Sequence, residues 1–197
     1  MYPGDSPPNI QRVSDLNMGD SLTASTVILG CHIGTHVDAP AHFLGQGLMV
    51  HELPLESFWG PALVINQQGK GRIDKADLEE LSISSQCHIF FKTNNSALLY
   101  GNVFTEKYCT LSRSAAQYLC QLNPLSIGWD YYSIDPVTNP ETFPAHVVFA
   151  EANIPVFVCL SLKDVPVGQY GFSGFPLRLI GVEASPVRAI LIPENEG

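Results

Sequence analysis

Three histidines and one aspartate lie within eleven consecutive positions, in the segment His32-Ile-Gly-Thr-His36-Val-Asp38-Ala-Pro-Ala-His42. Imidazole nitrogens bind borderline divalent ions such as zinc and manganese, and a carboxylate adds negative charge to the site. Two histidines and one aspartate would leave coordination positions free for water and substrate, as a catalytic ion requires. His42, with an ordinary pKa of about 6.5, is suited to move a proton at neutral pH. The spacing therefore predicts a catalytic metal site.

The alternative is that these residues are unrelated polar side chains in an irregular loop. Gly34 and Pro40 interrupt the segment, and it lacks an apolar stripe with helical spacing. We therefore expect a loop or a strand at the edge of a sheet. Half of the six histidines of the chain lie in this one segment, and this clustering favours the metal site.

The elements that must position this segment follow from the hydrophobic pattern. β-Branched and apolar runs predict strands at 26–29, 61–66, 87–93, 125–129, 154–160 and 188–193. Helices are expected at 75–81, at 112–119 with Ser112 as N-cap, and at 146–152. Residues 1–20, rich in Pro, Gly, Asp and Asn, predict an extended or looped arm. Strands and helices are mixed without regular βαβ units, so we expect an α/β fold with a mixed sheet and short helices, in one domain of residues 1–197.

Composition limits the class of partner. The chain has 197 residues and a formal net charge of −9, with no basic run, which argues against nucleic acid or an anionic membrane. The five cysteines are widely spaced without a C-x-x-C pair, as expected for reduced thiols. Cys31 lies beside His32, but a metal-bound imidazole cannot activate a thiol. We expect a cytoplasmic enzyme with a small-molecule substrate.

The motif H-x-G-T-H-x-D-x-P-x-H-F resembles the signature of the metal-dependent cyclase family, which includes bacterial kynurenine formamidases and isatin hydrolases. Further matches to that family are Tyr2-Pro-Gly-Asp5, Ile127-Gly-Trp-Asp130 with Ser133-Ile-Asp135, Phe175-Pro-Leu-Arg-Leu, and Ser185-Pro-Val-Arg188-Ala. These matches extend over nearly the whole chain. The resemblance implies a swivelling β/β/α fold and hydrolysis of an amide bond, with an aryl formamide as the first candidate substrate and an isatin-type lactam as the second.

The resemblance also assigns roles. It makes His32, His36 and Asp38 the metal ligands and His42 the general acid/base. His146 matches a histidine that binds a second zinc in the formamidases, with plain packing as the alternative. Twelve positions later, where the formamidases carry a glutamate ligand, this chain has Val158. Valine has no lone pair to donate, so we expect one divalent ion, zinc or manganese, rather than two.

The remaining polar and aromatic residues receive structural roles. Asp130 and Asp135 are expected to fix turns through backbone amides. His51 and His88 are expected to be structural, and Phe43 to pack behind the metal loop.

The resemblance also bears on assembly and on a rival function. Family members usually carry a D-L-S-x-P-L strand before Y-P-G-D, whereas this chain opens at Met1-Tyr-Pro-Gly-Asp. We expect either that the sequence is shortened or that this family strand has been lost, and in both cases that substrate binding is altered or weak. The rival is a non-catalytic member that binds a ligand or partner; the enzyme is favoured because all four chemical residues are present. The family also implies a homo-oligomer, a dimer or tetramer in which a neighbour reaches toward the active site.

Overall fold

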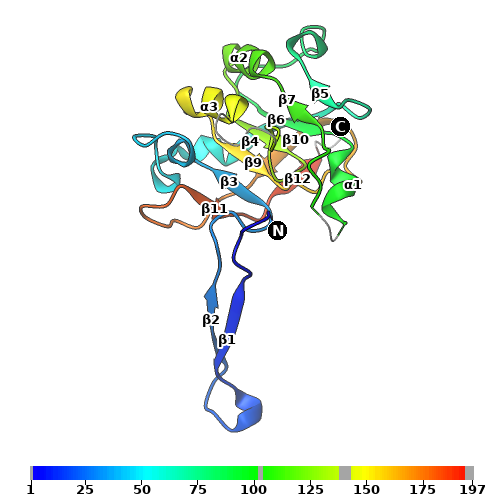
Figure 1. The fold of residues 1–197 in the computed structure, drawn as a ribbon. Coiled ribbons are helices and arrows are strands. Elements are labelled where there is room, and N and C mark those ends of the chain that lie inside the picture. Colours follow the sequence, from blue (N-terminus) through cyan, green and yellow to red (C-terminus); the bar gives the residue numbers. More distant parts are fainter. Residues whose placement is uncertain (1, 102–103, 138–142, 194–197) are drawn as a thin grey trace.

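The computed structural model describes residues 2–101, 104–137 and 143–193. They form a body built on one large sheet, from which a two-stranded hairpin projects (Figure 1). The hairpin pairs β1 (Asn9–Ser14) with β2 (Ala24–Ile28), and a 3-10 turn at Leu16–Met18 lies near its tip. Residues 1–20 were expected to form an extended arm, and this hairpin confirms an arm at that end of the chain.

The large sheet has eight strands. Their spatial order is β11 (Ala184–Pro186), β3 (His36–Asp38), β9 (Val156–Val158), β8 (Ser126–Trp129), β6 (His88–Lys92), β4 (Trp59–Asn66), β10 (Gly168–Ser173) and β12 (Ile190–Pro193). The central strands β4, β6, β8 and β9 are parallel, and the strands on either side of them pair antiparallel. The expected α/β fold with a mixed sheet is therefore confirmed.

The sheet must curl strongly. Strands β11 and β12 lie at opposite edges of the sheet, yet only residues 187–189 connect them along the chain. So short a connection can span the two edges only if the sheet bends toward itself. Val187 N also donates a hydrogen bond to Thr35 O at 3.0 Å, which ties this connection to the turn before β3. The sheet is thus a half-barrel.

Each face of the sheet has its own core. Val156 and Val158 pack on the face covered by α2 (Arg113–Gln121) and α3 (Pro144–Glu151), whereas Phe157 packs on the opposite, inner face. This alternation follows from the two-residue period of a strand. The remaining elements are α1 (Asn95–Leu99), the small parallel pair β5 (Arg72–Ile73) and β7 (Thr110–Leu111), and 3-10 turns at Pro40–His42, Val50–Glu52, Leu55–Ser57 and Lys75–Asp77. No helix in the described part of the chain is long and apolar enough to cross a membrane.

Several sequence expectations need correction. The metal-binding segment was expected to be a loop or an edge strand, but β3 lies inside the sheet between β11 and β9. The helix expected at 75–81 is a single 3-10 turn, because Leu78 is fully buried while the neighbouring residues give a longer helix little to pack against. The helix expected at 146–152 begins two residues earlier, at Pro144. Strands β10 and β11 and helix α1 were not anticipated.

Candidate metal centre

Strand β3 points two of the expected ligands to the same side. His36 and Asp38 alternate with Val37, which is fully buried in the core of the inner face. Across the sheet, His36 pairs with Val158 and Asp38 with Val156. Both ligand side chains are buried, and the partner strands on either side of β3 hold their backbone in place.

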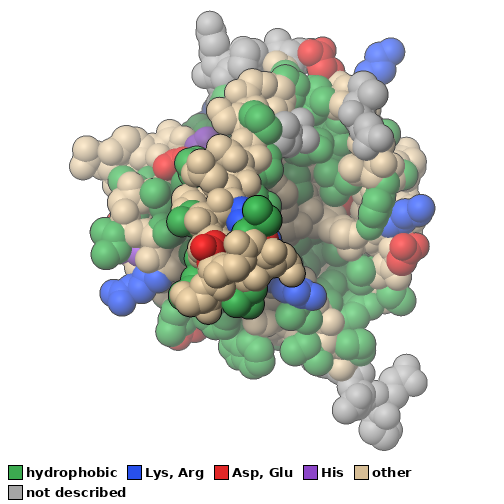
Figure 2. All heavy atoms as spheres, turned by 90° about the horizontal axis from the view of Figure 1, so that it is seen from below, with side chains coloured by type: hydrophobic (Ala, Val, Ile, Leu, Met, Phe, Trp, Pro, Cys, Tyr) green, Lys and Arg blue, Asp and Glu red, His purple; other side chains and the backbone are tan. Residues whose placement is uncertain are grey.

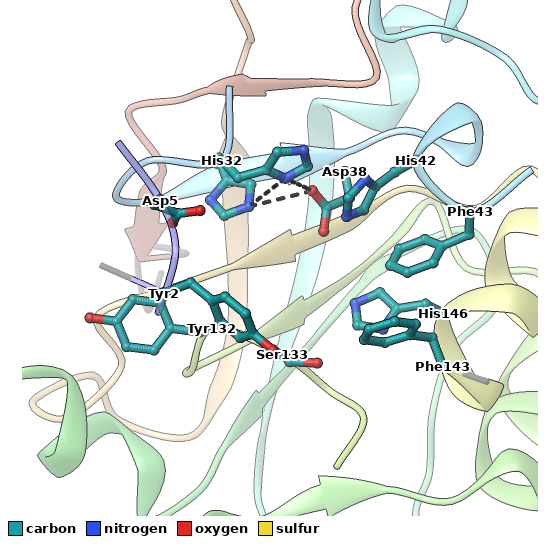
Figure 3. A pocket seen from close by; sticks show the side chains of 11 residues that line it. Tyr2, Asp5, His32, Asp38, His42, Phe43, Tyr132, Ser133, Phe143 and His146 are labelled. Carbon is teal, nitrogen blue, oxygen red and sulfur yellow. Dashed lines mark hydrogen bonds and ion pairs between the residues drawn. The ribbon is translucent and has the colours of Figure 1, made fainter. Parts of the chain in front are cut away.

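The third ligand comes from the turn before β3. Gly34 has φ of +62°, a left-handed conformation that glycine adopts without strain and that lets the chain reverse direction here. The turn places His32 over the end of β3. After the strand, Pro40 opens the 3-10 turn that carries His42. His32, Asp38 and His42 therefore gather at one place (Figure 3), and His36 joins them through its contact with His32.

The three ligand atoms converge on one another. His32 Nδ1 lies 3.3 Å from His36 Nε2 and 2.9 Å from Asp38 Oδ1, and His36 Nε2 lies 3.4 Å from the same oxygen. Zinc bonds of about 2.0–2.1 Å in a tetrahedron would separate ligand atoms by roughly 3.3 Å. Among the described residues, these three form the one group of potential ligands whose atoms all lie within 4.8 Å of one another.

The chemistry of these donors also fits a cation. Asp38 Oδ1 is buried and, within the described part of the chain, accepts no well-directed hydrogen bond, although two ring nitrogens lie beside it. A buried carboxylate oxygen in that state is costly unless a cation satisfies it. His36 Nδ1 donates to Gly34 O at 2.8 Å, which leaves Nε2 with a lone pair facing the cluster. The residues present therefore fit a divalent ion.

The surroundings shift the pKa values of Asp38, His32 and His42 in different directions. Burial alone would raise the pKa of Asp38, but His36, His32 and His42 hold that pKa well below its usual range, so the carboxylate is ionised. Burial lowers the pKa of His32, but the carboxylates of Asp38 and Glu183 more than offset it and the net pKa is raised. Burial is the largest influence on His42 and lowers its pKa. His32 and His146 lower this pKa further, whereas Asp38 raises it, and the net pKa is lowered. His42 is therefore neutral at pH 7 and able to accept a proton.

A pocket of about 240 Å³ opens in front of the cluster. It is lined by Tyr2, Asp5, His32, His36, Asp38, His42, Phe43, Tyr132, Ser133, Phe143 and His146. Aromatic rings form much of its wall (Figure 3). Phe43 does not pack behind the metal loop as expected; it faces the pocket and stacks on His146 with ring centroids 4.4 Å apart. The reason is that the 3-10 turn at Pro40–His42 swings the next side chain toward α3.

His146 faces this pocket from the first turn of α3. Its Nδ1 lies 2.8 Å from Asp135 Oδ2, and Asp135 also accepts hydrogen bonds from the backbone amides of Ala145 and His146. Asp135 therefore anchors the helix start and fixes the orientation of the His146 ring. His146 is not part of the three-residue ligand cluster, so its binding of a second ion stays a prediction.

The other residues considered from the sequence have structural contacts. Asp130 accepts four hydrogen bonds from the amides and hydroxyls of Thr93 and Ser96, which fixes a turn as expected. His88 is buried and bonds Ser126 Oγ at 2.6 Å. Burial, with the nearby carboxylate of Glu183, raises the pKa of Cys31, which makes it a poor nucleophile.

Some pocket residues were not anticipated. Tyr132 and Phe143 line the pocket from positions about a hundred residues after the metal motif. Glu183, which is farther still along the chain, contacts His32 of that motif. No local pattern marks them, because the sheet order alone brings these segments together. Glu183 lies two residues before Ser185, in the C-terminal motif, and that proximity was the one available signal.

Comparison with known proteins gives consistent matches. The family described as "Putative cyclase" matches residues 3–136. The chain is 30% identical over 191 residues to a kynurenine formamidase of Geobacillus thermodenitrificans, covering 97% of this chain and 90% of that protein. A kynurenine formamidase of Salinibacter ruber is also 30% identical, over 193 residues and with the same coverage.

Solved structures agree in fold. A protein described as a potential metal-dependent hydrolase with cyclase activity superposes with a TM-score of 0.79 at 30% identity, covering 92% of this chain and 85% of that one. Isatin hydrolase A from Labrenzia aggregata superposes with a TM-score of 0.84 at 20% identity, covering 98% and 86%. At that lower identity the likeness concerns the fold.

Proposed function

The chain belongs to the putative cyclase family, and from this premise we propose that it is a metal-dependent hydrolase of amide C–N bonds. The observation that carries the proposal is the convergence of His32, His36 and Asp38 beside a neutral histidine, at the wall of an aromatic pocket. An aryl formamide is the preferred substrate, since curated relatives with 30% identity are kynurenine formamidases. A small cyclic amide is the second choice.

The ligand set suggests the cofactor. When bound, a divalent ion at these three ligands supplies polarisation of a carbonyl oxygen and a lowered pKa of water. We propose zinc or manganese, because both accept a mixture of imidazole and carboxylate ligands. One ion per chain is proposed rather than two, since Val158 and not a carboxylate faces His36 from the neighbouring strand.

His42 performs the proton transfers in this proposal. As water adds to the carbonyl carbon, its proton passes to the neutral imidazole of His42. The C–N bond then breaks as His42 returns that proton to the leaving nitrogen, so the products are a carboxylic acid and an amine. The lowered pKa of His42, caused chiefly by burial, keeps the ring free to accept the proton at pH 7.

The pocket supports an aromatic substrate. Phe43, Phe143, Tyr2 and Tyr132 offer ring faces and edges around a small space, and aromatic pairs with centroids 4.5–7 Å apart are favourable beyond simple burial. At about 240 Å³ the space is slightly smaller than typical ligand pockets of about 300–1,000 Å³. This size suits a single substituted ring better than a polymer.

The test uses purified protein stripped with a chelator and reloaded with zinc or manganese. N-formylkynurenine and isatin are the two probes, with the metal-free protein as the control. We expect metal-dependent release of the amine from the formamide. If the metal-loaded protein turns over neither aryl formamides nor lactams, the proposal fails. A non-catalytic binding role is not favoured, because all four chemical residues converge at the pocket.

We also propose that the chain forms a homo-oligomer through the β1–β2 hairpin. The hairpin extends away from the body (Figure 1), and in the view from below it projects toward the reader with apolar side chains on its surface (Figure 2). Ile10 is 71% exposed and Met18 is 83% exposed. A lone two-stranded hairpin is marginally stable in water, so burial against a second copy would stabilise it.

We also propose that the protein is located in the cytoplasm, and cell fractionation tests this.

A further inference from the structure

His32 contacts a carboxylate on the side of its ring that faces away from the cluster. Glu183 Oε1 lies 3.1 Å from His32 Nε2, while Nδ1 of the same ring faces His36 Nε2 and Asp38 Oδ1. Both ring nitrogens have a carboxylate neighbour, Asp38 at Nδ1 and Glu183 at Nε2. A cation held at the cluster needs the lone pair of Nδ1, so in the metal-binding state the ring proton lies on Nε2 and is donated to Glu183. The other nitrogen, Nδ1, then keeps its lone pair directed at the cluster, which is the state a metal ligand needs.

His32 needs such a partner more than His36 does. His36 belongs to a strand inside the sheet, its side chain is 5% exposed, and its outer nitrogen donates to Gly34 O. His32 lies in a turn and its side chain is 26% exposed. Without a second contact its ring could rotate or exchange the proton between its nitrogens. Glu183 thus does for His32 what the backbone carbonyl of Gly34 does for His36.

The fold holds Glu183 at a defined position relative to the ligands. Glu183 immediately precedes β11, and Ala184, the first residue of that strand, pairs with Asp38. The carbonyl of Glu183 accepts a hydrogen bond from Ala39 N at 2.9 Å. The backbone of Glu183 is therefore fastened to the end of the strand that carries a metal ligand, and its side chain reaches over to His32.

We infer that Glu183 is a positioning residue for the metal centre, one that fixes the ring orientation and the tautomer of His32. This inference rests on the proposed metal site. Carboxylates that orient a metal-bound histidine in this way contribute substantially to metal affinity.

Metal affinity measured by chelator competition tests the inference without any substrate. Zinc and manganese are titrated into metal-free wild type and four variants. Glu183→Ala and Glu183→Met remove the acceptor, and Glu183→Met keeps the length of the side chain. Glu183→Gln keeps an acceptor oxygen. Glu79→Ala is the control, since it removes an exposed carboxylate paired with Lys75 rather than with a histidine.

The expected result is a loss of metal affinity of about 10–100-fold in Glu183→Ala and Glu183→Met, with Glu183→Gln and Glu79→Ala within about threefold of wild type. Cobalt-loaded Glu183→Ala should also show an altered visible spectrum, because the geometry at His32 relaxes. Should Glu183→Ala fail to fold, the pair Glu183→Met and Glu183→Gln decides.

Three results overturn the inference. If wild type binds no metal, the proposed metal site fails, and the inference fails with it. If wild type binds metal and both acceptor-free variants bind equally well, the inference alone fails. If Glu183→Gln loses as much affinity as Glu183→Ala, the hydrogen-bond acceptor is not what matters, and the positioning role is wrong.

Discussion

Val158 lies directly opposite His36 where β9 pairs with β3. Paired residues on neighbouring antiparallel strands project from the same face of the sheet, with Cβ atoms about 4.5–5.5 Å apart. Val158 is fully buried on the face that carries the metal ligands. A side chain at this position is therefore next to the metal centre, and its chemistry bears on how many ions the centre binds.

Val158→Glu is expected to add an oxygen ligand beside His36 and to raise the zinc content from one ion per chain toward two, with His146 as a further ligand. In the metal-free variant the new carboxylate replaces a fully buried apolar side chain, so its desolvation should lower the free energy of unfolding by several kcal/mol. Elemental analysis after dialysis measures the zinc content, and Val158→Leu is the control. A variant that folds and still holds one ion contradicts the prediction.

His42→Ala is expected to lower kcat by about 10²–10⁴-fold, because the group that moves the proton is lost. Metal content should be unchanged, since His42 is outside the three-residue ligand cluster. Steady-state kinetics on an aryl formamide, together with elemental analysis, separates the two effects. His51→Ala is the matched control, because His51 accepts a hydrogen bond from Gly181 N outside the pocket. Equal kcat in His42→Ala and wild type would remove the proton-transfer role.

Replacing an exposed apolar pair of the hairpin by charged residues tests assembly through this surface. Ile10 and Val27 are paired across β1 and β2 and are 71% and 54% exposed. The double variant Ile10→Lys with Val27→Glu replaces this apolar pair by an opposite-charge pair that still supports the hairpin. By light scattering, we expect this double variant to be monomeric and wild type to be oligomeric.

The adjacent pair provides the control for that test. Gln11 faces Thr26 in the register of the hairpin, on the opposite face from Ile10 and Val27. Gln11→Lys with Thr26→Glu introduces the same charges and should leave the oligomer intact. A monomeric wild type, or an oligomer that survives the change at Ile10 and Val27, argues against assembly through this surface.

His88 makes the fold sensitive to acid. Burial lowers the pKa of His88 to about 4, and the Trp59 carbonyl offsets only part of this. Below its ordinary pKa of 6.5 the imidazole binds a proton in the unfolded chain but not in the native state. The free energy of unfolding therefore falls as the pH drops from about 6.5 toward 4, by roughly 3 kcal/mol for this shift.

Urea denaturation of metal-free protein at pH 7 and pH 4 measures this effect. Wild type should lose about 3 kcal/mol more than His88→Gln over that interval, because glutamine does not titrate. Every other ionisable group is common to the two proteins, so its contribution cancels in the difference. Equal losses in the two proteins would show that His88 is not responsible.

Part of the fold could be predicted from the sequence. The buried runs at 61–66, 87–93 and 125–129 form β4, β6 and β8, and Ser112 caps α2 by accepting a hydrogen bond from Ala115 N. These elements were predictable because their signals are local. The helix expected at 75–81 was a wrong prediction, and a 3-10 turn forms there instead. Its hydrophobic pattern suits a helix, but Leu78 is the one residue of this segment that is buried.

The sequence by itself was enough to predict the candidate ligand set. His32, His36 and Asp38 lie within seven positions, so a turn and a short strand suffice to bring them together, and the two-residue period of a strand already places His36 and Asp38 on one face. Their types alone specify a divalent cation as the group they would bind.

Only the tertiary structure decided what surrounds these ligands. Glu183 reaches His32 across 151 positions of sequence, and Val158 faces His36 because β9 is the strand that pairs with β3. Phe143 and Tyr132 join the pocket wall in the same way. Such contacts depend on the order of strands in the curled sheet, and strand order is set by long-range packing that no local spacing records.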